Sequence, residues 1–341
     1  LLISFSSLAV GFLARPLGGI VFGHFGDRIG RKRTLVVALM MMGVTTTLIG
    51  FLPTYASIGV AAPILLVLLR FVQGLAIGGQ WGGAMLLVTE SAPADQRGWY
   101  GAYAQAGAPL GVVLANLAFI GVSSSMSDEA FMDWGWRLPF IASIVLIGIS
   151  MYIQLKIEDT QAFQSLSNAQ SATDKPAETV KRSPVIEAIR KYPKRIMLAA
   201  GAFLSVQVTF YILIAFVISY GMQSPNLMLS KDLMLTAVLV AAAIMVPTQF
   251  YFSGLSDRIG RKNVYRWGAI LTGAWGFALF PLIDTGNPLF ICLAITVGLL
   301  FLGMQYGPQA AYFTELFSTE VHRSFQNFKL CDFMFFIFFN F

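Results

Sequence analysis

Charge is scarce along this chain. Only 12% of its 341 residues are Asp, Glu, Lys or Arg, whereas 56% are hydrophobic, and the mean hydropathy is +0.70. A soluble domain of this length has no interior large enough to hide so much apolar surface. The composition therefore excludes a soluble globular protein and predicts a polytopic membrane protein.

Residues that carry chemistry are equally scarce. The two cysteines, Cys292 and Cys331, give no disulfide framework. The two histidines, His24 and His322, fall in loops, and no acidic residue lies inside an apolar run. Without a nucleophile–base pair, a Cys/His cluster or a phosphate loop, we expect no enzyme activity, no metal and no cofactor.

Long apolar stretches are what the sequence does have. A membrane-spanning helix needs roughly 20 apolar residues, and nine stretches qualify: 1–22, 34–52, 63–89, 99–122, 136–155, 196–220, 233–252, 267–283 and 289–313. Barrel strands would be half as long, so the spans are helices. Most Lys and Arg fall in alternate loops, which is the positive-inside pattern rather than a nucleic-acid footprint. We expect a multi-pass protein of the plasma membrane, the bacterial inner membrane, with the long loop 156–195 in the cytoplasm.

Two internal repeats divide the chain. The hexapeptide at 27–32 recurs unchanged at 257–262, and the Gly- and Gln-containing run at 78–83 resembles the run at 303–308. Repeats at matching places indicate two related halves. We predict an N-terminal helical bundle at 1–155, a linker at 156–195, a C-terminal bundle at 196–324 and an atypical, Phe-rich tail at 325–341.

The repeated loop carries a family resemblance. Residues 23–33 resemble the loop signature between helices 2 and 3 of the major facilitator superfamily, although the second copy begins with Ser253 instead of Gly. Three further segments, 15–19, 90–98 and 136–140, resemble the metabolite–proton symporters of that superfamily, a branch with shikimate, dicarboxylate and proline/betaine permeases. The resemblance implies an all-α major facilitator fold in which the nine spans correspond to helices 2 to 10 of twelve.

The same resemblance implies a function. It implies secondary active transport: uptake of a small anionic metabolite together with a proton, by alternating access, in a monomer that binds no nucleic acid. A facilitative sugar carrier shares the loop motif and stays open as an alternative. Another alternative is an inactive, truncated remnant of a transporter gene, because helices 1, 11 and 12 have no counterpart here and the tail is interpreted as a frameshifted or truncated end.

Charges inside spans are costly and mark candidate functional sites. Arg15 and Arg70 are the two such charges, and Arg70 opens a stretch that resembles the R-x-x-Q-G motif of helix 4, in which the arginine handles proton or substrate. Polar residues at helical spacing complete a predicted substrate and proton pathway: Arg15, Arg70, Gln73, Gln80, Trp81, Gln105, Gln207, Tyr211, Gln305 and Gln309. We expect Gln305 and Gln309 opposite Arg70. The simpler interpretation of each amide is a hydrogen bond between helices.

The two basic loops are expected to close the cytoplasmic side. Asp257 can face the start of the helix near Gly98, where a helix N-terminus favours negative charge. In the first copy, Arg28 or Arg31 should pair with Glu90, and Asp27 with Arg97. The predicted gating residues are Asp27, Arg28, Arg31, Glu90, Arg97, Asp257, Arg258, Arg261 and Glu315. The simpler interpretation is a basic loop that only sets topology.

Overall fold

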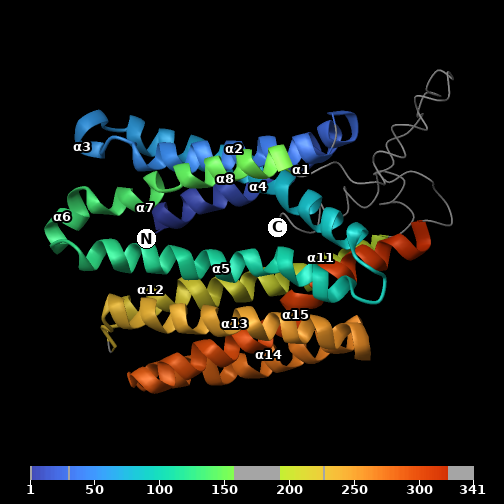
Figure 1. Ribbon diagram of the computed structural model, residues 1–341. Helices are drawn as coiled ribbons and strands as arrows, with labels where there is room; N and C mark the ends of the chain where they lie inside the picture. The colour runs from blue at the N-terminus through green and yellow to red at the C-terminus, as the bar shows by residue number, and fades with distance from the viewer. Residues whose placement is uncertain (1, 30, 157–192, 226, 322–341) are drawn as a thin grey trace. The chain divides into compact units, whose positions relative to one another are not determined.

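The fold is entirely helical wherever it is described. A computed structural model describes residues 2–29, 31–156, 193–225 and 227–321, and all regular secondary structure within these ranges is helix (Figure 1). Lipid offers backbone N–H and C=O groups no hydrogen-bond partners, and a helix satisfies them internally. The expected all-α membrane fold is confirmed.

The predicted spans coincide with helices. Before the long linker the chain forms α1 (Leu2–Ile29), α2 (Arg31–Gly50), α3 (Tyr55–Ile58), α4 (Ala61–Ser91), α5 (Arg97–Ser124), α6 (Asp128–Asp133), η1 (Gly135–Arg137), α7 (Leu138–Ile141) and α8 (Ile144–Lys156). After the linker it forms α11 (Pro193–Tyr211), the π-helix η2 (Ile212–Phe216), α12 (Val217–Gln223), α13 (Lys231–Ile259), α14 (Arg261–Asp284) and α15 (Pro288–Val321). Among the described residues, seven helices are long and apolar enough to cross a membrane. The span expected at 136–155 is broken into η1, α7 and α8.

The basic loop of the second repeat is far shorter than expected. The sequence predicts a loop over 253–266, but α13 continues to Ile259 and α14 begins at Arg261. Gly260 alone reverses the chain, with φ at +93°, a conformation that glycine adopts without a Cβ clash. The predicted loop is too long because both helices continue beyond the ends of their apolar runs. Asp257 and Arg261 consequently lie on helices, on either side of this single connecting residue.

Two compact units form in the chain. One is built from the described residues of 1–87, 134–201 and 317–341, and the other from Val88–Asp133 and Ala202–Leu316. Helix α5 therefore packs with the helices that follow the linker. The two sequence halves inferred from the repeats remain a prediction about how the chain is built, and most of the linker between them lies outside the described residues.

Close backbone contact between α1 and α4 organises the first unit. A Cβ added to Gly74 would fall on the carbonyl oxygen of Gly11, and one added to Gly78 would fall on the carbonyl oxygen of Arg15. Glycines four residues apart let membrane helices approach this closely. Gly74 and Gly78 therefore form the face of α4 that packs directly on the backbone of α1.

An apolar core and one long helix pair organise the second unit. Buried side chains of α11, α12, α13, α14 and α15 make up the core, and α5 runs beside α13 (Figure 1). Trp99 of α5 lies against Gly254, and Tyr103 meets Phe250 edge-on with ring centroids 4.9 Å apart. Along this contact the residue numbers of α13 decrease as those of α5 increase, so the two helices run antiparallel.

Adding one methyl group at the α1–α4 contact should destabilise the protein. We predict that Gly78→Ala lowers the free energy of unfolding by about 1–3 kcal/mol, because the Cβ must push the two backbones apart. Thermal unfolding of the purified protein measures the change. Gly148→Ala is the matched control, because no atom lies within 4 Å of its added Cβ. Equal melting temperatures for the two variants would contradict the tight packing.

Candidate functional site

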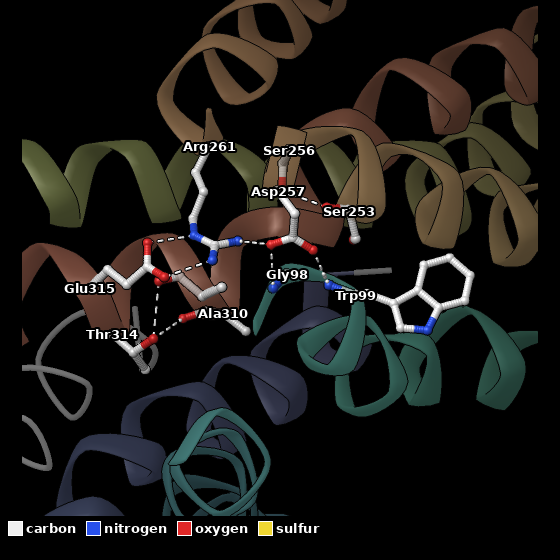
Figure 2. A network of polar contacts seen from close by, with 10 residues as sticks. Gly98, Trp99, Ser253, Ser256, Asp257, Arg261, Ala310, Thr314 and Glu315 are labelled. Atoms are coloured by element: carbon white, nitrogen blue, oxygen red, sulfur yellow. Dashed lines mark hydrogen bonds and ion pairs between the residues drawn. The ribbon is translucent and has the colours of Figure 1, made fainter. Parts of the chain in front are cut away.

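A carboxylate from another helix caps the start of α5 in the second unit. The two carboxylate oxygens of Asp257, near the end of α13, accept hydrogen bonds from the backbone N–H groups of Gly98 and Trp99, each at 2.9 Å (Figure 2). These N–H groups belong to the first turn of α5 and have no partner within their own helix. A carboxylate at this end also meets the positive pole of the helix dipole. The contact that the sequence predicts for Asp257 is confirmed.

An arginine joins this cap to a third helix. Figure 2 shows the Arg261 guanidinium between two carboxylates. Its Nη1 donates to Asp257 at 2.7 Å, while Nε and Nη2 donate to the two oxygens of Glu315 on α15 at 2.5 and 2.6 Å. Paired parallel bonds of this kind match the planar fork of arginine to a carboxylate. One cation thus holds together the end of α13, the start of α14 and the end of α15.

The network is partly withdrawn from water. The exposed side-chain fractions of Arg261, Asp257 and Glu315 are 10%, 9% and 31%. Hydrogen bonds to charged groups contribute roughly 1.5–3 kcal/mol when formed, and a buried charge that loses its partner is strongly destabilising. The network is therefore strong where it is dry, and its bonds weaken where water can replace them.

Gly98 makes the cap possible. A Cβ at this position would lie 2.6 Å from Arg261 Nη1, 2.7 Å from Asp257 Oδ1 and 2.8 Å from the Ser253 carbonyl oxygen. All three distances are shorter than any normal contact, so only glycine lets the carboxylate reach the helix end.

The first copy of the repeated loop cannot be compared in the same detail. The side chains of Asp27, Arg28, Arg31 and Glu90 lie outside the described residues. Their expected pairings, including that of Asp27 with Arg97, stay predictions. Arg258, the other expected gating residue of the second copy, is exposed.

Polar residues of the first unit are arranged around α4. Arg70 Nη1 donates to Gln73 Oε1 at 3.2 Å, and Gln73 Nε2 donates to Thr46 Oγ1 on α2 at 2.6 Å. The Arg15 guanidinium lies over the Phe12 ring, 4.1 Å from its centroid. Gln80 is half-buried, and the side chain of Trp81 lies outside the described residues. The structure thus brings Arg70 and Gln73 together, as their spacing predicts.

Polar residues of the second unit lie deep between helices. Gln105 Nε2 donates to the Tyr306 carbonyl oxygen at 3.0 Å, and Gln305 Nε2 donates to Thr272 Oγ1 at 2.9 Å. Gln309 is fully buried, whereas Gln207 and Tyr211 on α11 are half-buried. Gln105 and Gln305 therefore each link two helices through a side-chain hydrogen bond. Their place in a transport pathway, and the position of Gln305 and Gln309 opposite Arg70, stay predictions.

Sequence reasoning missed several polar partners. Thr46 and Thr272 accept hydrogen bonds from the side-chain amides of Gln73 and Gln305. Gln249 and Ser253 form a buried polar stripe on α13. The spacing of Gln249, Ser253 and Asp257 at four-residue steps was the available signal, because such residues share one helix face. Within the described residues, no three His, Cys, Asp or Glu side chains gather as metal ligands would.

Comparison with known proteins places this architecture in a family. The sequence profile described as "Major Facilitator Superfamily" matches residues 2–326. A putative metabolite transport protein of Haemophilus influenzae is 39% identical over 94% of this chain and 72% of its own length. The shikimate transporter of Escherichia coli is 38% identical over 95% of this chain and 72% of its own length.

Solved structures agree on the fold. The proton:xylose symporter XylE superposes with a TM-score of 0.71 and 16% sequence identity, covering 97% of this chain and 75% of that one. A partially occluded, inward-open form of XylE from E. coli gives a TM-score of 0.66, with 99% and 80% covered. Similarity at this level of identity concerns the fold alone.

Changing the shape of the central cation should weaken the network. We predict that Arg261→Lys lowers the free energy of unfolding by about 1–3 kcal/mol, because an ammonium cannot make the paired bonds to Glu315 while also reaching Asp257. Thermal unfolding at low and moderate salt is the measurement. Arg258→Lys is the matched control, since Arg258 lies in the same hexapeptide but is exposed. If Arg261→Lys behaves like its control, the network contributes nothing to stability.

Proposed function

This chain belongs to the major facilitator superfamily, and from that premise we propose that it imports a small organic anion together with a proton. Membership makes it a multi-pass inner-membrane transporter rather than an enzyme. The identity of its solute class and its coupling to protons are the parts that we propose.

The proposal of an anionic solute rests on the environment of Arg70. Its guanidinium is half-buried within a membrane-spanning helix, where an arginine charge is expensive. Within the described part of the chain, its hydrogen bond to Gln73 is made by Nη1, which leaves most of the donor fork unused. A planar fork of donors fits a carboxylate in a paired geometry.

The relatives support a solute that carries a carboxylate, although proline and betaine are zwitterions and not net anions. One is named a shikimate transporter and another a proline/betaine transporter, and each of these named solutes carries a carboxylate. Proton coupling is proposed from the segments that resemble the metabolite–proton symporters. A facilitative sugar carrier remains a second candidate, because such carriers share the motif of the loop at 23–33. Dependence on a pH gradient separates the two candidates.

Uptake by the purified protein in proteoliposomes tests the proposal. We expect a panel of radiolabelled small carboxylates to accumulate above equilibrium under an inward proton gradient, with accumulation lost on adding a protonophore. A neutral sugar should not accumulate. Sugar equilibration without dependence on the gradient would favour the carrier, and transport of neither would remove the proposal.

Replacing Arg70 by lysine sharpens the same experiment. Lysine keeps the charge but loses the planar fork, so uptake of the carboxylate by Arg70→Lys should fall, by about tenfold if one paired bond is lost. Arg33→Lys is the matched control because Arg33 is exposed near the start of α2. Unchanged uptake in Arg70→Lys would assign Arg70 a purely structural role.

We further propose that the Asp257 network is the closed cytoplasmic gate. The network sits at the ends of α13 and α15, on the side that the basic loops place in the cytoplasm. Alternating access requires the cytoplasmic side to open. It opens if α5 moves away from the Asp257 carboxylate. The gate is supported by the trans-helix cap and by the partial exposure of Glu315.

A methyl group at Gly98 should hold this gate open. Gly98→Ala places a Cβ 2.7 Å from Asp257 Oδ1, so the cap cannot form. A reporter cysteine at Ser253, which is fully buried beneath the cap, should then react faster with a membrane-impermeant maleimide added to inverted vesicles. Cys292 and Cys331 are replaced by alanine beforehand. Gly107→Ala is the control on the same helix, because its Cβ meets nothing within 4 Å. An unchanged reaction rate in Gly98→Ala would sink the gating role.

A further inference from the structure

A polar stripe lies inside the second unit, one turn below the charged network. Gln249 and Ser253 of α13 are each 0% exposed. They face α15 at Gly307: a Cβ there would collide with Ser253 Oγ and lie 2.8 Å from the Gln249 carbonyl oxygen. Gly307 therefore provides the room in which these two side chains lie.

A third polar side chain reaches the same level from α5. Trp99 lies beside Gly254 and Tyr103 beside Phe250, so the antiparallel register places Gln105 level with Gln249. Gln105 is also 0% exposed, and its Nε2 donates to the carbonyl of Tyr306, the residue next to Gly307. Three helices thus bring polar atoms to one buried place.

Most of these polar atoms have no partner. Within the described residues, Gln105 Oε1, Ser253 Oγ, and both Oε1 and Nε2 of Gln249 are buried without a hydrogen bond. An amide or hydroxyl enclosed in this way suffers the full desolvation penalty. Gln309 is also buried and unpaired, but it lies about 200° around α15 from Gly307 and so belongs to a different place.

We propose that water binds between α5, α13 and α15, in a hydration site formed by Gln105, Gln249 and Ser253. The site offers neutral acceptors from both amides, a donor from Gln249 Nε2 and a hydroxyl that serves as either. Water both donates and accepts, and typically makes about three such bonds when buried. A bound anion or cation would need a charged partner, and none of these three side chains carries charge.

Water in this place eases the parting of the helices. Ser253 lies one turn from Asp257, so the site is directly behind the capped start of α5. Without bound water, these polar groups would stay without hydrogen-bond partners until α5 had moved far enough to admit water. Bound water instead exchanges one partner for another as the distance grows. The water site itself stands whichever solute the protein carries.

Radiolytic labelling of the whole protein tests for this water. Brief X-ray exposure in H₂¹⁸O turns bound water into hydroxyl radicals that oxidise the nearest reactive side chains, even buried ones. Met245 lies one turn from Gln249 on the same face of α13, and Met234 lies on the same helix far from the site; they are 1% and 0% exposed. We expect severalfold faster ¹⁸O incorporation at Met245. Equal protection of both methionines would overturn the proposal.

Removing the polar atoms should remove the label. In the double variant Gln249→Leu with Ser253→Ala, oxidation of Met245 should fall to the level of Met234, while Thr236→Ala, a polar change at an exposed position of α13, should leave it unchanged. Ser253→Ala alone keeps the test open if the double variant fails to fold. Persistent oxidation of Met245 in these variants would show that the water is held by other residues and overturn the assignment.

Discussion

The packing of α5 depends on one carboxylate that caps a helix to which it does not belong. Asp257 occupies the backbone donors at the start of α5, and this contact fixes both the height and the rotation of α5 along α13. The pairing of Tyr103 with Phe250 and the reach of Gln105 to Tyr306 follow from that register. All of these contacts require glycine at position 98, since a side chain there would keep the Asp257 carboxylate from reaching the start of α5.

Two kinds of contact join helices in the two units. Between α1 and α4 of the first unit, glycines bring backbones into direct contact, while α4 also meets α2 through the Gln73–Thr46 hydrogen bond. In the second, charged and amide groups meet across helices. Packed backbones have nothing to exchange with water, whereas polar partners do. The first kind of contact suits a part that moves as one body, and the second suits a surface that separates.

Much of this arrangement was predictable from the sequence, because it depends on local patterns. Apolar runs predicted the helices, helical spacing predicted that Arg70 and Gln73 lie together, and the repeated loop predicted that Asp257 meets the start of α5. The partners of buried amides were not predictable. Thr46 and Thr272 lie on other helices, and no periodicity within one helix indicates which neighbour it will meet. The loop at Gly260 was predicted too long because hydropathy measures where lipid ends, not where a helix ends.

The single residue between α13 and α14 has a mechanical consequence. With Gly260 as the whole connection, the two helices have no slack and form one lever with a fixed bend. Arg261, the first residue after the bend, is tied to α15, and Asp257, just before it, is tied to α5. A force applied at either tie reaches the other without being absorbed by a loop. Glu315 and Gly98 are therefore connected through Arg261 and Asp257 by an unbroken series of hydrogen bonds.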